Sequence, residues 1–347
     1  MVFKIKPINM KKELKQICCP LCGFEKSKII FTHARLANIR RTYASKESVK
    51  KFMTNLNTEL CRNCGFLYRK PLMEDEELRR YYASSYVETF KPKANKQNKD
   101  DDEPYSAKLL KEKITYGKHF NFLARNGIDL KGKRILDVGC GTGWFLALMN
   151  EYIPLYRLGI EPSKQRCNDI ARIQEFDFEV LNGCVRDFLP ERLGKFDLIT
   201  MIGVLEHLND PIANLKTIRS FTSDRTYLYI YTHNETPNLF IDMKKRISLV
   251  HQLYFTPRTI RVLFEKVGLQ IIDLKTRFTE MYILAKKYKP FDSQYKFNRI
   301  QHNLLKTRYM LSKNIPSSFF SISPRFYFKY LAVRDRLSNM RIINKNI

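Results

Sequence analysis

The segment from Ile135 to Gly143 constrains the fold of this chain more than any other. It reads Ile-Leu-Asp-Val-Gly-Cys-Gly-Thr-Gly, so an apolar strand delivers Asp137 into a turn that has glycine at every second position. Glycine adopts backbone dihedrals closed to other residues and lets a ligand approach the peptide plane, while residues 144–149 continue as a predicted helix. A nucleoside-type ligand fits across such a strand end, although a dinucleotide fingerprint looks similar.

Strand-like and helix-like segments alternate after this turn. An apolar run at 158–160 ends at Glu161, further segments follow at 176–183 and from Phe196 onward, and helical stretches lie at 165–175 and 212–221. This alternation predicts an α/β domain with a parallel sheet and helices on both faces. Ligands of such sheets bind outside the carboxyl ends of the strands, where the Glu161 carboxylate can accept hydrogen bonds from two ribose hydroxyls.

These segments resemble class I S-adenosylmethionine-dependent methyltransferases in their motifs, order and spacing. The resemblance rests on the glycine turn at 137–143, on Glu-Pro-Ser at 161–163, and on Phe-Asp-Leu-Ile at 196–199 followed by Val-Leu-Glu-His-Leu-Asn-Asp-Pro at 204–211. It covers roughly residues 104–288 and implies a Rossmann-like fold with a mostly parallel, seven-stranded sheet. The alternative is a Rossmann-like domain that binds a nicotinamide or no ligand.

The resemblance also implies how S-adenosylmethionine would be held. The glycine turn would hold the methionine part, Glu161 the ribose, and the segment after Gly183 the adenine. Family members often have an acid directly after that glycine, whereas this chain has Cys184, with Asp187 three residues later. The residues predicted to bind the cofactor are Asp137, Gly139, Cys140, Gly141, Gly143, Glu161, Pro162, Gly183, Cys184, Val185 and Met201.

Two Cys-x-x-Cys pairs near the amino terminus indicate a metal site. They are Cys19 with Cys22 and Cys61 with Cys64, and glycine follows the second cysteine of each pair. Two such pairs complete a tetrahedral tetrathiolate site, for which structural zinc is the expected ion. Cys18 could replace Cys19 with a three-residue spacer. A disulfide framework and reduced, buried cysteines are the other interpretations.

Composition and charge divide the chain into four predicted parts. With 347 residues and 44% hydrophobic content, it can bury a Rossmann-sized core and a small satellite domain. We expect a zinc-ribbon-like module at 1–90, a polar linker at 91–104, the S-adenosylmethionine-binding domain at 105–288 and a basic, partly helical extension at 289–347. The start of the chain has no apolar segment of signal-peptide length and no run of 18 apolar residues occurs, so we expect a cytoplasmic protein.

The formal net charge of +27 raises the possibility of a nucleic-acid partner. The charge is spread along the chain, except that residues 289–347 hold twelve Lys or Arg against two acids, with aromatic residues between them. This extension could cover the catalytic domain, lie on an anionic membrane surface, or contact a phosphate-bearing substrate. No feature of the sequence indicates an oligomeric state.

The order of a zinc module and a methyltransferase core narrows the resemblance. It is similar to bacterial methyltransferases with an amino-terminal zinc-binding domain, among them sugar C-methyltransferases and relatives found with polysaccharide biosynthesis. His-x-x-x-Phe-Thr at 251–256 matches an element after the fifth strand of that family, whose histidine lies near the substrate. In that family a carboxylate precedes the histidine and a third domain follows, whereas Val250 and the basic extension occupy those places here.

Three histidines are candidates for a catalytic base. Transfer of the activated sulfonium methyl to oxygen or nitrogen needs in-line alignment and a base of near-neutral pKa, which histidine provides. The candidates are His251, on a loop leaving the sheet, His207, beside Glu206 after the fourth strand, and His233, at the end of the fifth. Glu206 is expected to assist or to hold the loop. The alternative for each histidine is a structural hydrogen bond.

The sequence therefore predicts methyl transfer from S-adenosylmethionine to a sugar or sugar-containing glycan precursor. The acceptor atom is expected to be oxygen or nitrogen, with carbon as a further option. An RNA methyltransferase that uses the basic surface is the first alternative, and a non-catalytic zinc-bearing partner protein is the second.

Overall fold

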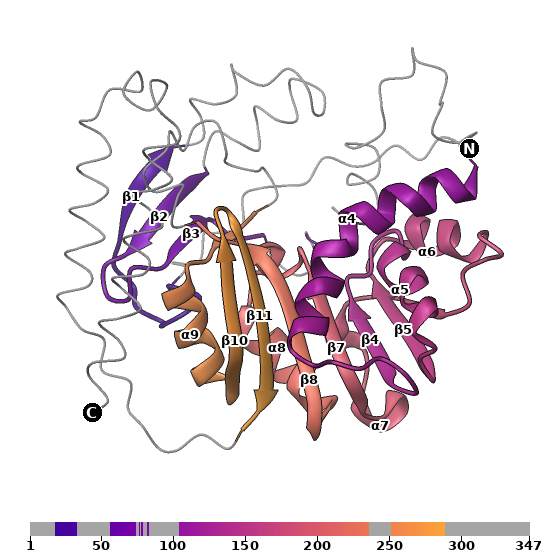
Figure 1. Ribbon diagram of the computed structural model, residues 1–347. Coiled ribbons are helices and arrows are strands. Elements are labelled where there is room, and N and C mark those ends of the chain that lie inside the picture. Colours follow the sequence, from indigo (N-terminus) through magenta and orange to yellow (C-terminus); the bar gives the residue numbers. More distant parts are fainter. Residues whose placement is uncertain are drawn as a thin grey trace, which may run out of the picture. The chain divides into compact units, whose positions relative to one another are not determined.

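The computed structural model describes residues 18–32, 56–73, 76, 78, 82, 104–235 and 251–288 (Figure 1). The predicted linker, apart from Pro104, and the basic extension at 289–347 lie outside these residues. The membrane and phosphate roles considered for the extension therefore stay predictions. No helix in the described part of the chain is long and apolar enough to cross a bilayer.

A seven-stranded, mostly parallel sheet forms the centre of the larger domain, as predicted. Its strand order is β10-β11-β8-β7-β4-β5-β6. The pairs from β8 to β6 are parallel, and β11 is antiparallel to both of its neighbours. The strands are β4 (Arg134–Val138), β5 (Tyr156–Glu161), β6 (Glu179–Asn182), β7 (Phe196–Ile202), β8 (Thr222–His233), β10 (Leu269–Arg277) and β11 (Glu280–Lys287).

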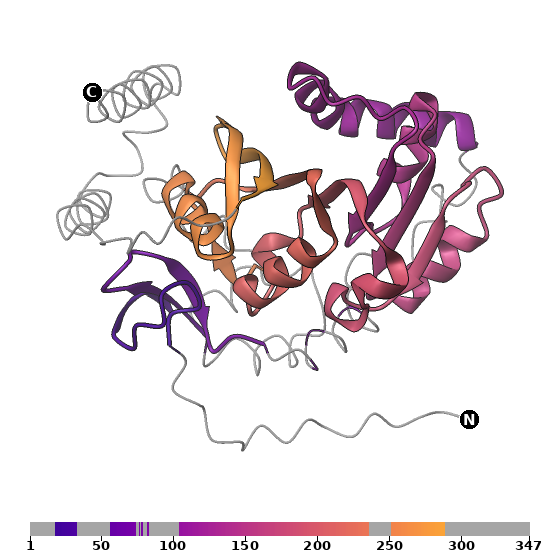
Figure 2. The same cartoon turned by 90° about the horizontal axis from the view of Figure 1, so that it is seen from below.

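Helices cover both faces of this sheet (Figure 2). They begin where the sequence supplies caps, since Asp210 Oδ1 accepts a hydrogen bond from Ala213 N–H at 2.9 Å and Thr256 and Pro257 open the next helix. The helical elements are α4 (Tyr105–Arg125), α5 (Trp144–Leu148), η3 (Met149–Tyr152), α6 (Lys164–Ala171), η4 (Val185–Asp187), α7 (Pro190–Leu193), η5 (Leu205–His207), α8 (Pro211–Ser220) and α9 (Pro257–Lys266).

Alternate strand residues enter two separate core clusters. Ile135 and Leu198 pack with side chains of α4 and α5 on one face, whereas Leu136 and Ile199 pack with α8 and α9 on the other. All four are at most 1% exposed. Burial of each such side chain contributes roughly 1.5–3 kcal/mol, so both faces anchor the sheet whose carboxyl edge carries the site.

A smaller antiparallel sheet carries the four cysteines that were predicted to bind metal. Its order is β1-β2-β3-β9, with β1 (Ser27–Thr32), β2 (Asn57–Cys61) and β3 (Leu67–Lys70) from the amino-terminal region. The fourth strand, β9 (Leu253–Tyr254), comes from the larger domain. The Phe66 and Phe255 rings lie 5.2 Å apart within one core cluster that joins both parts. The cysteine module therefore shares a sheet and a core with the larger domain.

Candidate active site

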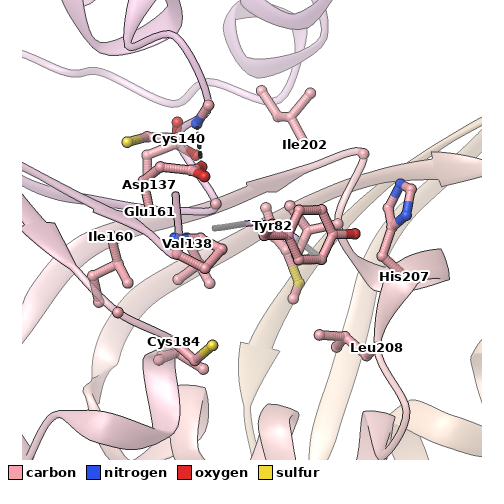
Figure 3. Close-up of a pocket in the computed structure, with 18 of the residues that line it drawn as sticks. Tyr82, Asp137, Val138, Cys140, Ile160, Glu161, Cys184, Ile202, His207 and Leu208 are labelled. Atoms are coloured by element: carbon pink, nitrogen blue, oxygen red, sulfur yellow. Dashed lines mark hydrogen bonds between the residues drawn. The ribbon is translucent and has the colours of Figure 1, made fainter. Parts of the chain in front are cut away.

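A cavity of about 480 Å³ lies at the carboxyl ends of β4, β5 and β7 (Figure 3). The glycine turn, the end of β5, η4 and η5 all contribute to its wall. Every residue predicted to bind the cofactor lines it except Gly143. The parallel strands end at one edge of the sheet, which is why motifs far apart in sequence meet there.

The glycine turn keeps the cavity open through two different constraints. Gly139 has φ 73°, and a Cβ there would lie 2.5 Å from Val204 Cγ2, so only glycine fits. Gly143 does not line the cavity. It has φ 80°, precedes α5 and would place a Cβ 2.8 Å from the Phe178 ring. The third glycine of the motif is thus explained by close packing against the segment before β6 rather than by the predicted cofactor contact.

Glu161 lies at the end of β5 with both carboxylate oxygens held by backbone donors. Gly141 N–H donates to Oε2 at 2.9 Å and Ser163 N–H donates to Oε1 at 3.0 Å. The side chain is 5% exposed, and burial raises the pKa of its carboxyl although these two donors and Arg166 oppose the shift. Each carboxylate oxygen can accept a second hydrogen bond, so this geometry fits a ribose diol.

Asp137 places a second carboxyl group in the same wall. Burial and, to a smaller extent, neighbouring Glu161 raise the pKa of Asp137 to about 7, against a 2.6 Å hydrogen bond from the Thr200 hydroxyl. Two carboxyl groups next to each other in a buried wall favour a cationic ligand. S-adenosylmethionine carries a sulfonium and an ammonium group, so the charge of this wall fits it.

The cavity wall that follows β6 has Cys184 at the position where members of the resembled family often have an acid. Cys184 and Asp187 both line the cavity, and Cys184 N–H donates to Asp187 Oδ2 at 2.8 Å. Asp187 therefore caps the η4 turn with that oxygen. Val185 is buried beside it and gives this part of the wall an apolar surface.

Glu206 and His207 lie in a turn that forms the cavity wall opposite Glu161. In the view of Figure 3, His207 and Glu161 lie on opposite sides, with Tyr82 between them. Glu206 is 2% exposed, and its Oε2 accepts a hydrogen bond from the Thr232 hydroxyl at 2.8 Å. His207 lines the cavity, whereas Glu206 does not. Glu206 thus fixes the conformation of the turn. Of the two residues, His207 is the one that can contact a ligand in the cavity.

His251, the first candidate for the base, does not line the cavity. Its ring lies 4.8 Å from the rings of both His207 and His233, measured between centroids. Burial lowers the pKa of His251 to about 2, and His207, His233 and Arg69 add to the shift. A neutral imidazole of such low basicity is a poor proton acceptor. His207, which lines the cavity, is therefore a better candidate for the catalytic base than His251.

Several residues of the cavity wall lie outside the sequence motifs. Tyr116 comes from α4, Phe145 from α5 and Arg166 from α6. Only Arg166 has a sequence signal, since it follows Glu161-Pro-Ser in the first turn of the next helix. The other two enter the site because α4 and α5 pack against each other over one face of the sheet.

The four predicted cysteines converge in the smaller sheet, with Cys19 rather than Cys18 as the first member. Their Sγ atoms all lie within 4.8 Å of one another, with Cys19 to Cys64 at 3.6 Å and Cys22 to Cys61 at 3.5 Å. Sulfurs at 2.3 Å from a tetrahedral zinc ion are about 3.8 Å apart, so the donor set fits zinc in both chemistry and spacing.

Comparison with known proteins identifies the class of the larger domain. Residues 107–274 match a family described as a methyltransferase domain. Together with the sheet and the glycine turn, this match supports a class I S-adenosylmethionine-dependent methyltransferase domain.

The similar curated proteins modify different substrates. The chain is 31% identical over 148 residues to the tRNA U34 carboxymethyltransferase of Campylobacter concisus, which covers 40% of this chain and 49% of that protein. It is 23% identical over 196 residues to the ubiquinone biosynthesis O-methyltransferase of Vibrio parahaemolyticus, covering 52% and 77%. The chain thus spans about half the length of the first of these relatives.

Among solved structures, the magnesium protoporphyrin IX methyltransferase of Synechocystis PCC 6803 with bound SAH is similar at 15% identity. The TM-score is 0.44, and the match covers 62% of this chain and 100% of that one.

Proposed function

We propose that this chain transfers the methyl group of S-adenosylmethionine to a hydroxyl of a sugar or sugar-containing glycan precursor. The observation that carries the proposal is the cavity itself, which has the glycine turn and Glu161 on one side and His207 on the other. Cofactor and acceptor would meet between them. The zinc module in front of the methyltransferase domain, and the His251 element after the fifth strand, support a sugar acceptor by resemblance.

Different residues of the chain would bind the cofactor and act on the acceptor. The Glu161 carboxylate binds the ribose, and Asp137 places negative charge near the cationic part of the cofactor. Alignment does most of the catalysis, because the sulfonium methyl is already activated for in-line displacement. His207, which lines the cavity, would take the proton of the acceptor hydroxyl, and Glu206 would fix the turn. The four cysteines would hold structural zinc, in keeping with a reducing cytoplasm.

An RNA acceptor is the second candidate, and two observations favour it. The net charge is +27, and relatives that match this chain act on tRNA. Phosphate contacts by a basic surface would supply affinity without sequence readout. The basic extension at 289–347 would then contact phosphates rather than cover the domain or lie on a membrane.

The test is transfer of radiolabelled methyl from S-adenosylmethionine into a host extract separated into nucleic-acid, nucleotide-sugar and glycolipid fractions. Label in a sugar fraction is expected, and His207→Gln should reduce it. Label confined to RNA would replace the sugar acceptor with the second candidate. Absence of label from every fraction, together with absence of cofactor binding, would contradict both and leave a non-catalytic partner protein.

A further inference from the structure

A second group of potential metal ligands lies beside the cavity, apart from the four cysteines. Glu206, His207 and His251 each offer one ligand atom, and these atoms lie within 4.8 Å of one another. Donors bound to a common ion at 2.0–2.2 Å lie about 3–4 Å apart. Side-chain rotations that move each atom by about an ångström would therefore bring all three onto one ion.

Buried hydrogen bonds hold two of these three residues, Glu206 and His207. Thr232 donates to Glu206 Oε2 at 2.8 Å, and the backbone N–H of Gln252 donates to the Glu206 carbonyl at 2.9 Å. The Gln252 side-chain amide also donates to the His207 carbonyl at 2.9 Å. Thr232 and Gln252 are both fully buried. The Thr232 bond orients the Glu206 carboxylate as outer partners orient metal ligands, and the two Gln252 bonds fix the backbone of the turn.

The ligand types favour a transition metal. Imidazole suits zinc, iron, copper and nickel, whereas magnesium and calcium prefer oxygen ligands. Two imidazoles and one carboxylate also leave a coordination position open, as in catalytic zinc sites.

We infer that Glu206, His207 and His251 bind a divalent transition-metal ion of the zinc type, whose open coordination position faces the cavity. His207 lines the cavity and Glu206 and His251 lie behind it, so the ion would sit in the wall opposite Glu161. His233 is close by, with Nε2 3.7 Å from Glu206 Oε1, and can act as a further ligand or as a partner of the carboxylate.

The catalytic consequence rests on the proposed methyl transfer. The open position would take the acceptor hydroxyl and lower its pKa, as zinc lowers the pKa of bound water to about 7. The hydroxyl proton passes to solvent water, and the oxygen forms a bond to the methyl carbon. The carbon–sulfur bond breaks with its electron pair on sulfur, which leaves a neutral thioether. The ion would then activate the hydroxyl in place of His207.

Cobalt titration of the full chain tests the site directly. The protein is loaded with one equivalent of zinc, which the four thiolates take first, and is then titrated with Co²⁺ and followed by visible absorption and by metal analysis. We expect one cobalt equivalent without thiolate charge-transfer bands. His251→Gln and Glu206→Gln should weaken this binding on the order of 100-fold or more, because each removes a ligand.

His119→Gln is the matched control, since this buried histidine of α4 is hydrogen-bonded to Tyr229 and is not one of the three proposed ligands. It should leave cobalt binding unchanged. S-adenosylmethionine affinity is measured for every variant to show that each is folded.

The possible results test the metal site and the proposed methyl transfer independently of each other. Absence of cobalt outside the thiolates in the wild-type protein, or its retention in both ligand variants, would overturn the site. In that case, loss of methyl transfer in His207→Gln would still support the proposed function with His207 as a base. Cobalt binding in a chain that binds no S-adenosylmethionine would uphold the site and refute the function.

Discussion

The buried carboxyl of Asp137 makes opposite predictions for stability and for cofactor binding. Its pKa is raised from 3.8 to about 7 in the folded chain. Between these values the folded state holds a proton that the unfolded state has lost, so the free energy of unfolding falls as pH rises. The slope is about 1.4 kcal/mol per pH unit, which sums to about 4 kcal/mol by pH 7.

Asp137→Asn removes this titration and keeps an oxygen that can accept the Thr200 hydrogen bond. The variant should unfold like the wild type near pH 4 and be more stable by as much as about 4 kcal/mol at pH 8. Urea unfolding at pH 5, 6, 7 and 8 can be followed through Trp144, the only tryptophan, which is buried next to the turn. Asp129→Asn, on an exposed turn, is the control and should follow the wild type.

The same variant should bind S-adenosylmethionine more weakly, and the loss should be larger at pH 8 than at pH 6. The ionised carboxylate attracts the cationic cofactor, whereas the protonated form resembles asparagine. Calorimetric titration of the cofactor at both pH values measures this difference. Equal pH slopes of stability in the variant and the wild type would refute the assigned pKa, and stronger cofactor binding by the variant would refute the charge argument.

The remaining predictions concern the ribose, the turn and the link to the cysteine module. Glu161→Ala should weaken S-adenosylmethionine binding about tenfold or more, through loss of a charge-assisted hydrogen bond, and unchanged affinity in the same titration would remove the ribose assignment. Gly143→Ala should lose about 1–2 kcal/mol of stability from its positive φ plus a further cost from the Phe178 contact. Gly132→Ala, at φ 65° with open space, should show the first cost alone in urea unfolding. Gln252→Ala should reduce stability by about 1–3 kcal/mol and slow methyl transfer while leaving cofactor affinity unchanged, whereas exposed Gln270→Ala should alter none of the three.

The cofactor half of the site was predictable because its residues belong to local motifs. The glycine turn and Glu161 each end a strand, and parallel strands bring those ends together whatever the rest of the chain does. Gly143 is the exception, because its closest constraint is the Phe178 ring, which no local pattern reveals. A motif thus gives the position of a residue more reliably than the reason for it.

The other half was predicted less well because long-range packing assembles it. The position of His251 behind His207 depends on the segment at 251–255, which pairs with β3 and packs on Phe66. Tyr116 enters through α4, which has no motif. Spacing along the chain carries no information about such contacts, so the sequence identified the histidines without giving their order around the cavity.

The position of Gln252 connects the cysteine module to the acceptor side of the cavity. Its carbonyl accepts a hydrogen bond from Arg69 N–H at 2.7 Å and its side chain accepts one from Met73 N–H at 2.5 Å, both in the amino-terminal region. The same residue bonds the backbones of Glu206 and His207. Among the described residues, no hydrogen bond joins Glu161 or the glycine turn to the amino-terminal region. Loss of metal from the four cysteines should therefore disturb the wall at His207 and leave the cofactor wall intact, so the module would support acceptor positioning rather than cofactor binding.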